Sequence, residues 1–144
     1  YIEGREFFVS ILGNNTIKPL PVIELDFKDW PTDKPKIYTY EAKVEVNSSE
    51  YKAIKNKIPD DLSGELQIKM QEIVIRAYKA IHGQDYARAD IRIDQSGKIY
   101  ILEINLNPYL GKDSETAFAA KSAGIEYEEL ITKIVELALA RSEK

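Results

Sequence analysis

Hydrophobic and polar residues alternate, or β-branched and aromatic residues cluster, in three segments of the first third of the chain. These segments are 7–12, 16–25 and 36–46, and we expect each to be a strand. Gly13 and the two asparagines after it predict a turn behind the first strand, and Pro19 and Pro21 suit an edge or bulged strand for the second. The stretches 26–36 and 47–62 are polar and contain prolines, so we expect them to be connections.

The period changes to three and four residues further along the chain, which predicts helices. The first covers about 63–81 and should end at Gly83. A second helix is capped by Asp113 or Ser114 and ends at Gly124, and a third covers about 126–141. Strands followed by helices in a chain of 144 residues predict a single α+β domain.

A β-hairpin is expected between the first two helices. Small and apolar residues from Ala87 to Ile93 alternate with charged ones, Ser96-Gly97 predicts a turn, and 98–105 forms the returning strand. With a two-residue loop, Gln95 pairs with Lys98. The same register places Asp90 opposite Glu103 and Arg88 opposite Asn105.

Two opposed carboxylates repel each other unless a cation or a proton joins them. Asp90, Glu103 and the amide of Asn105 offer hard oxygen ligands, which suit Mg²⁺ or Mn²⁺ rather than zinc. A solvated face of an antiparallel sheet would show the same charges, so the spacing leaves both interpretations open. A register shift of one residue would remove the site.

Composition excludes several other kinds of chemistry. The chain has no cysteine and one histidine, so thiolate nucleophiles, disulfides and multi-histidine metal sites are ruled out. The net charge of −4 argues against nucleic-acid binding through bulk charge, and no apolar run is long enough for a membrane span. The first residues include neither a Met nor a signal-peptide pattern, and we expect the chain to be the back part of a longer protein.

Several motifs in order resemble the D-alanine–D-alanine ligases of the ATP-grasp superfamily. The hairpin supplies Arg88-Ala89-Asp90 and Glu103-Ile104-Asn105. The other matching motifs are Gly4-Arg5-Glu6-Phe7 before V-x-x-L-G-N, Tyr40-Glu41-Ala42-Lys43, and Ala123-Gly124-Ile125-x-Tyr127-x-x-Leu130. The resemblance implies an ATP-grasp C-terminal subdomain over 1–144, with a mostly antiparallel sheet and flanking helices.

The resemblance also implies a reaction and its cofactors. Such ligases phosphorylate a carboxylate with ATP, and an amine then attacks the acyl phosphate to form an amide. Asp90, Glu103 and Asn105 would bind Mg²⁺ or Mn²⁺, and Arg88 would stabilise the transferring phosphoryl group. Lys43 would contact phosphates and Glu6 the ribose, while Ile2 would lie on the hinge that reads adenine, and Ile37 and Leu102 would contact the base.

The substrate half of the pattern is altered. Tyr109 stands where the family has a glycine that helps form an oxyanion hole, and Val44 replaces a tyrosine. Ser114 matches the serine that binds the second substrate's carboxylate, although it is equally suited to cap a helix. We therefore expect small-molecule carboxylate and amine substrates other than the usual pair. From the same resemblance and composition we expect a cytoplasmic enzyme that binds neither nucleic acid nor a membrane. Whether it forms a homodimer is left open.

Two alternatives remain: a non-catalytic nucleotide-binding relative, and an ATP-grasp kinase that joins no amine. The resemblance places the first nucleotide subdomain and the N-terminal substrate domain upstream of Tyr1. We therefore expect this chain alone to bind Mg-ATP weakly and not to turn over.

Overall fold

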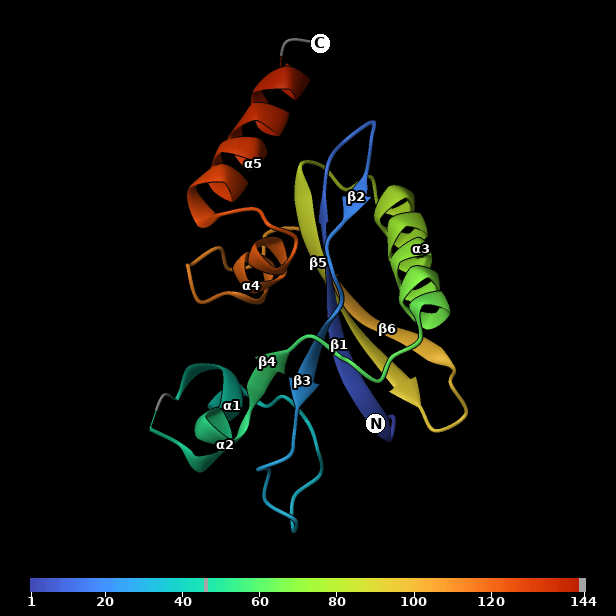
Figure 1. Cartoon of the computed structure of the whole chain (residues 1–144), viewed down its shortest axis with the longest axis vertical. Coiled ribbons are helices and arrows are strands. Elements are labelled where there is room, and N and C mark those ends of the chain that lie inside the picture. Colours follow the sequence, from blue (N-terminus) through green and yellow to red (C-terminus); the bar gives the residue numbers. More distant parts are fainter. Residues whose placement is uncertain (46, 143–144) are drawn as a thin grey trace.

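The fold is built around a single antiparallel sheet (Figure 1). The computed structural model describes residues 1–45 and 47–142. Within them the strand order is β4-β3-β1-β5-β6, with β2 paired to the end of β1, and every pairing is antiparallel. The strands are β1 Gly4–Leu12, β2 Lys18–Pro19, β3 Ile23–Asp26, β4 Lys55–Lys57, β5 Tyr86–Asp94 and β6 Ile99–Asn105.

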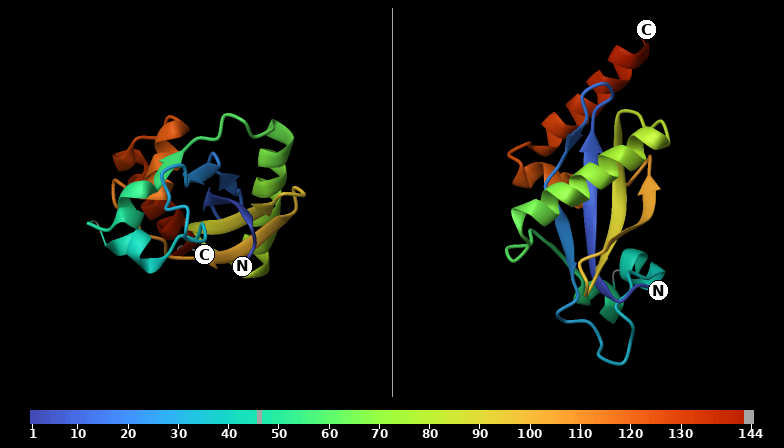
Figure 2. Two further views of the ribbon diagram at one scale, coloured as in Figure 1. Left: turned by 90° about the horizontal axis from the view of Figure 1, so that it is seen from below. Right: turned by 90° about the vertical axis from the view of Figure 1, so that its right-hand side faces the viewer.

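Helices cover both faces of the sheet (Figure 2). Helix α3, Gly64–Ala80, packs Met70, Val74 and Tyr78 against one face of β1 and β5. The opposite face carries α4, Glu115–Ser122, and α5, Tyr127–Ser142, together with the short helices α1, Tyr40–Val44, and α2, Ser49–Ala53. The central strands β1 and β5 are consequently buried on both sides. The α+β fold with a mostly antiparallel sheet and flanking helices, expected from the sequence, is confirmed.

The three long helices begin where the sequence predicts. Ser63 caps α3 by accepting a hydrogen bond from the Leu66 N–H, and Ser114 caps α4 by accepting one from the Ala117 N–H. The end of α3 differs in detail, because His82 rather than Gly83 adopts the positive φ of the terminating residue. Gly83 leaves room for the buried Tyr78 ring, which a Cβ at Gly83 would approach to 2.1 Å.

The strand expected over 36–46 is wrong for 36–45, and Val46 lies outside the described residues. Residues 36–39 are irregular and are followed by α1, whose Ala42 N–H bonds to the Thr39 hydroxyl. The edge of β3 that such a strand could join is occupied by β4, which the sequence analysis treated as a connection. Burial of Ala42 in the core then favours one helical turn over an unpaired strand.

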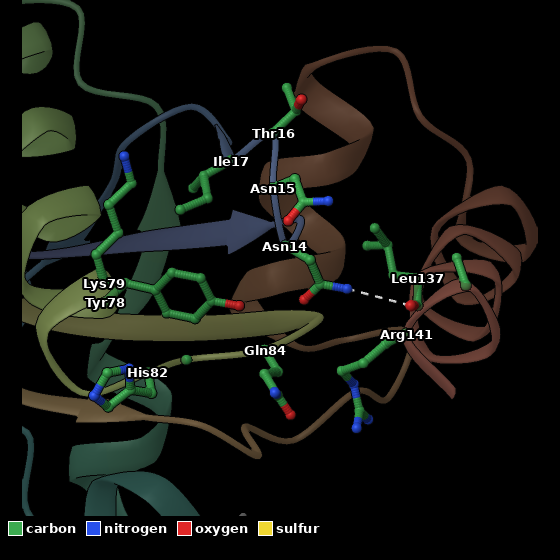
Figure 3. A pocket seen from close by; sticks show the side chains of 12 residues that line it. Asn14, Asn15, Thr16, Ile17, Tyr78, Lys79, His82, Gln84, Leu137 and Arg141 are labelled. Carbon is green, nitrogen blue, oxygen red and sulfur yellow. Dashed lines mark hydrogen bonds between the residues drawn. The ribbon is translucent and has the colours of Figure 1, made fainter. Parts of the chain in front are cut away.

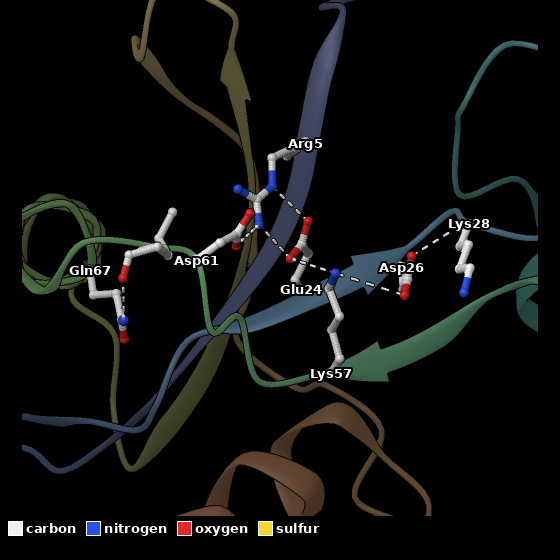
Figure 4. Close-up of polar contacts among 8 residues, drawn as sticks. Arg5, Glu24, Asp26, Lys28, Lys57, Asp61 and Gln67 are labelled. Carbon is white, nitrogen blue, oxygen red and sulfur yellow. Dashed lines mark hydrogen bonds and ion pairs between the residues drawn. The ribbon is translucent and has the colours of Figure 1, made fainter.

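A charged network ties the ends of β1, β3 and β4 together (Figure 4). Arg5 donates two hydrogen bonds to Glu24, at 2.7 and 2.6 Å, and a third to Asp61 at 2.7 Å. Lys57 reaches the same Glu24 carboxylate at 3.4 Å. Because Arg5 and Glu6 are successive strand residues, this network holds the backbone from which Glu6 projects to the other face.

The C-terminal helix is anchored through Asp85, which accepts hydrogen bonds from Asn14 at 2.9 Å and from Arg141 at 2.9 Å. A cavity of about 590 Å³ lies beside this anchor, between the β1–β2 turn, the end of α3 and α5 (Figure 3). None of the site residues expected from the sequence lines it. In the described part of the chain, no helix combines the length and apolar character that crossing a bilayer requires.

Candidate functional site

The β5–β6 hairpin brings the expected residues opposite each other, although not through the expected turn. Asp90 pairs with Glu103 and Arg88 with Asn105, as the sequence predicts. The connection holds three residues rather than two, because the Asp94 N–H bonds to the Lys98 carbonyl and Gly97 has a φ of 81°. A β-bulge at Leu102 then restores the register, since Ile91 pairs with Ile101 and Asp90 with Glu103.

Side chains from three adjacent strands form rows on the face of the sheet opposite α3. The register aligns residues of β1, β5 and β6 across this face. The first row is Glu6, Arg92 and Tyr100, the second is Phe8, Asp90 and Glu103, and the third is Ser10, Arg88 and Asn105.

A cavity of about 340 Å³ opens beside the first two rows. Seven of the residues expected to bind nucleotide or metal line it, namely Ile2, Glu6, Ile37, Lys43, Asp90, Leu102 and Glu103, whereas Arg88 and Asn105 do not. Leu102 and Glu103 are successive residues that a regular strand would direct to opposite faces, and the bulge allows both to reach one cavity. Lys43 reaches the cavity from α1, with its ammonium group 5.0 Å from the centre of the Tyr38 ring.

The charged face of β5 is buried, so its interpretation as a solvated face is wrong. Arg88, Asp90 and Arg92 are at most 9 % exposed. Arg88 donates to both Asp90 oxygens at 2.8 and 3.2 Å and to Glu115 of α4 at 2.9 Å, while its guanidinium lies 4.6 Å from the Phe8 ring centre. Three of its five N–H groups are thereby used, and two are left for another acceptor.

Burial shapes the electrostatics of the cavity. It raises the pKa of Asp90, and the facing Glu103 adds to this effect, while Arg88 opposes it. Burial also raises the pKa of Glu6, against the attraction of the neighbouring Arg92. Both carboxylates would be stabilised as anions by further positive charge in the cavity.

The oxygen donors fit a hard divalent cation that is bound partly by other ligands. Glu103 is exposed on the cavity wall, and Asp90 keeps lone pairs beyond those shared with Arg88. The Asn105 side-chain oxygen accepts the Asn107 N–H at 2.9 Å. No group of three or more His, Cys, Asp or Glu side chains gathers into a metal cage within 1–45 and 47–142. Two carboxylates and one amide oxygen would leave the other positions of a bound Mg²⁺ to waters and phosphate oxygens.

Ser114 lies at a second, smaller cavity. Its side chain is 2 % exposed and caps α4, and it lines a space of about 200 Å³ together with Tyr109 and Asp113. The Tyr109 hydroxyl donates to Asp113 at 3.0 Å. Tyr38 and Lys43 line both cavities, so the two spaces are adjacent.

Three residues at the site were not singled out from the sequence. Glu115 resembles an ordinary acidic residue in the first turn of a helix, and Tyr38 lies in the segment expected as a strand. Arg92 shares the charged face of β5, but only the register with β1 reveals its pairing with Glu6. The alternation of β5 was the one available signal for Arg92.

Comparison with known proteins agrees with this arrangement. The family described as D-ala D-ala ligase C-terminus matches residues 1–136. The chain is 36% identical over 145 residues to a D-alanine–D-alanine ligase of Carboxydothermus hydrogenoformans, covering 100% of this chain and 43% of the relative. It is 34% identical over 141 residues to the uncharacterised protein y4sG of Sinorhizobium fredii, covering 98% of this chain and 40% of that relative. The crystal structure of the Bacillus anthracis D-alanine–D-alanine ligase complexed with ATP superimposes with a TM-score of 0.73 at 26% identity, over 100% of this chain and 40% of that one.

The antiparallel sheet and its flanking helices are those of the ATP-grasp ligases. Within that class, the chain belongs to the D-alanine–D-alanine ligase C-terminal family. It spans about two-fifths of the length of the relatives it matches.

Proposed function

We propose that this chain forms the ATP- and metal-binding C-terminal part of an ATP-grasp domain in a carboxylate–amine ligase. The observation that carries the proposal is the opposition of Asp90 and Glu103 on the wall of a cavity that Glu6 and Lys43 also line. Nucleotide and metal ligands expected from separate motifs thus share one space.

The reaction follows from the chemistry of the family. A carboxylate oxygen attacks the γ-phosphorus of ATP, giving an acyl phosphate and ADP, and an amine then displaces phosphate to form an amide. Asp90, Glu103 and Asn105 would hold Mg²⁺, which when bound neutralises charge on the phosphates.

The remaining residues bind and orient the reactants. Lys43 would contact phosphate oxygens, because it reaches the cavity beside the two carboxylates. Arg88 would use its two remaining N–H groups on the transferring phosphoryl group. Ile2 and Leu102 would contact the base, since they are the apolar wall of the same cavity.

The second cavity would bind the amine substrate. Ser114 would donate its hydroxyl hydrogen to the substrate's carboxylate while its oxygen caps α4. Tyr109 supports an altered substrate, because its ring lines this cavity where the family pattern has no side chain. An amino acid other than D-alanine, a peptide or another amine would then be joined.

The test measures amide formation with release of ADP and phosphate by the protein that carries this chain. Glu103→Ala should abolish turnover, whereas Glu128→Ala, which removes an exposed carboxylate from α5, should not. Unchanged turnover in Glu103→Ala would refute the metal assignment.

A second candidate is a relative that binds nucleotide without joining substrates. The engagement of Arg88 by Asp90 and Glu115 favours it, because these bonds neutralise the charge that a phosphoryl group would meet. Mg-ATP binding without ADP release, over a panel of carboxylates and amines, would support this candidate. Phosphorylation without any requirement for an amine would instead support an ATP-grasp kinase.

A further inference from the structure

Arg92 presents a buried N–H group that lacks a hydrogen-bond partner. The residue is 3 % exposed and lines the cavity of about 340 Å³, and its Nε makes no hydrogen bond within the described residues. Its Nη2 donates to the carbonyl oxygens of Gly4 and Lys36, and these bonds hold the guanidinium in position. A buried donor left without an acceptor destabilises the folded protein, which makes this N–H a candidate contact for a ligand.

Glu6 is the ion-pair partner of the Arg92 Nε, but it lies too far away for a hydrogen bond. Glu6 is the cross-strand partner of Arg92, and its Oε2 lies 3.5 Å from the Arg92 Nε. This separation gives ionic attraction but exceeds the usual N–H···O distance of about 2.9 Å. Glu6 is 5 % exposed and lines the same cavity, so a ligand there could contact the carboxylate and the Arg92 Nε–H together.

The pair selects the chemistry of its ligand. An anionic ligand would accept a hydrogen bond from Arg92 but would be repelled by Glu6. A cationic ligand would be attracted by Glu6 but repelled by Arg92. A neutral hydroxyl satisfies both groups, because its oxygen accepts from the Arg92 Nε–H and its hydrogen is donated to the Glu6 carboxylate. The neutral hydroxyls of a nucleotide are those of its ribose.

We propose that Arg92 is a specificity-determining residue that binds a ribose hydroxyl together with Glu6. This inference rests on the proposed function, since it takes the cavity to hold a nucleotide. It adds that the site distinguishes ribonucleotides from deoxynucleotides through an arginine that sits beside the carboxylate.

The experiment titrates the protein that carries this chain with Mg-ATP, Mg-2′-deoxy-ATP and Mg-3′-deoxy-ATP, following binding by NMR chemical shifts so that weak affinities are measurable. The unaltered protein should bind at least one deoxy analogue about tenfold more weakly than ATP, as expected for one hydrogen bond to a charged group. In Arg92→Lys and Arg92→Met this preference should fall to about threefold or less. The matched control, Arg76→Met, changes an exposed arginine of α3 on the other face of the sheet and should keep the preference.

The Arg92 Nε–H resonance of the unaltered protein provides a second measurement, which applies even if the variants fail to fold. ATP should shift the Nε–H resonance of Arg92, and the analogue that lacks the contacted hydroxyl should not. Equal preference for ATP in Arg92→Lys and the unaltered protein, or equal Nε–H shifts with all three nucleotides, would overturn the role of Arg92 alone. Absence of binding by any nucleotide would overturn the proposed function and the inference with it.

Discussion

Asp90 and Glu103 face each other across the hairpin because Leu102, between Ile101 and Glu103, has no partner on β5. With a three-residue turn and no bulge, Leu102 would pair with Asp90, and Glu103 would face α3. The extra residue, Leu102, thus brings the two carboxylates opposite each other and also places its own apolar side chain beside them.

Leu102 offers a test of the apolar wall that leaves the fold intact. Its side chain is 48% exposed, so Leu102→Ala should change the free energy of unfolding by less than about 0.5 kcal/mol. Mg-ATP affinity should nevertheless fall by about threefold to tenfold, because a contact to the base is lost. Leu139→Ala, at an exposed leucine of α5, is the matched control. Equal ATP affinity in both variants would contradict the assignment of Leu102.

Glu115 should hold Arg88 in place. Glu115→Gln removes the charge of a contact in which both side chains are nearly buried, and we expect a loss of about 1–2 kcal/mol in denaturant unfolding. Glu128→Gln removes the charge from an exposed pair with Lys112 and should cost less than about 0.5 kcal/mol. Similar losses in the two variants would show that the buried contact has no special weight.

The attachment of α4 to the sheet can be measured with a double-mutant cycle. Ser10 of β1 and Thr116 of α4 share a buried hydrogen bond of 2.9 Å. Ser10→Ala leaves the Thr116 hydroxyl buried without this partner and should cost about 1–3 kcal/mol. Ser10→Ala combined with Thr116→Val should cost less than the sum of the single changes, because neither hydroxyl remains. Additive losses would argue that the bond contributes nothing of its own.

The hairpin turn should weaken in acid. Hydrogen bonds, first from the Ser96 hydroxyl and then from Lys98, Tyr100 and the Ser96 backbone, lower the pKa of Asp94 from 3.8 to about 2. A carboxyl whose pKa is lowered by folding stabilises the folded state above its unfolded pKa, and this contribution is lost as pH falls from about 4 through 2. NMR titration of the Asp94 carboxyl should give a pKa near 2, and Asp94→Asn should reduce the acid sensitivity of the turn. A titration midpoint near 4 would contradict the role of these hydrogen bonds.

The elements that the sequence predicted correctly carry strong local signals. The alternation of apolar and polar residues predicted β5 and β6. Serine caps together with helical periodicity predicted α3 and α4. The opposition of Asp90 and Glu103 was also predicted, but through a two-residue loop. The actual turn is one residue longer, and the bulge compensates for it. The bulge does leave a signal in the sequence, because the apolar positions change phase where Leu102 directly follows Ile101.

The failures depend on distant parts of the chain. Segment 36–46 has a strand pattern, but β4 occupies the edge where it would pair, so packing of Ala42 decides for a helix. From the sequence, the charged side chains of β5 were consistent with exposure to solvent. The helices that cover them, α1 and α4, lie far away in sequence. Glu115 and Arg92 were missed for the same reason, since their importance comes from neighbours on other elements.

Tyr38 and Lys43 stand between the two cavities and belong to the walls of both. Occupants of the two spaces would therefore contact opposite sides of these two residues. A ligand that displaces Lys43 in one cavity would therefore change the wall of the other cavity. Binding in one cavity would then alter affinity in the other without movement of the sheet.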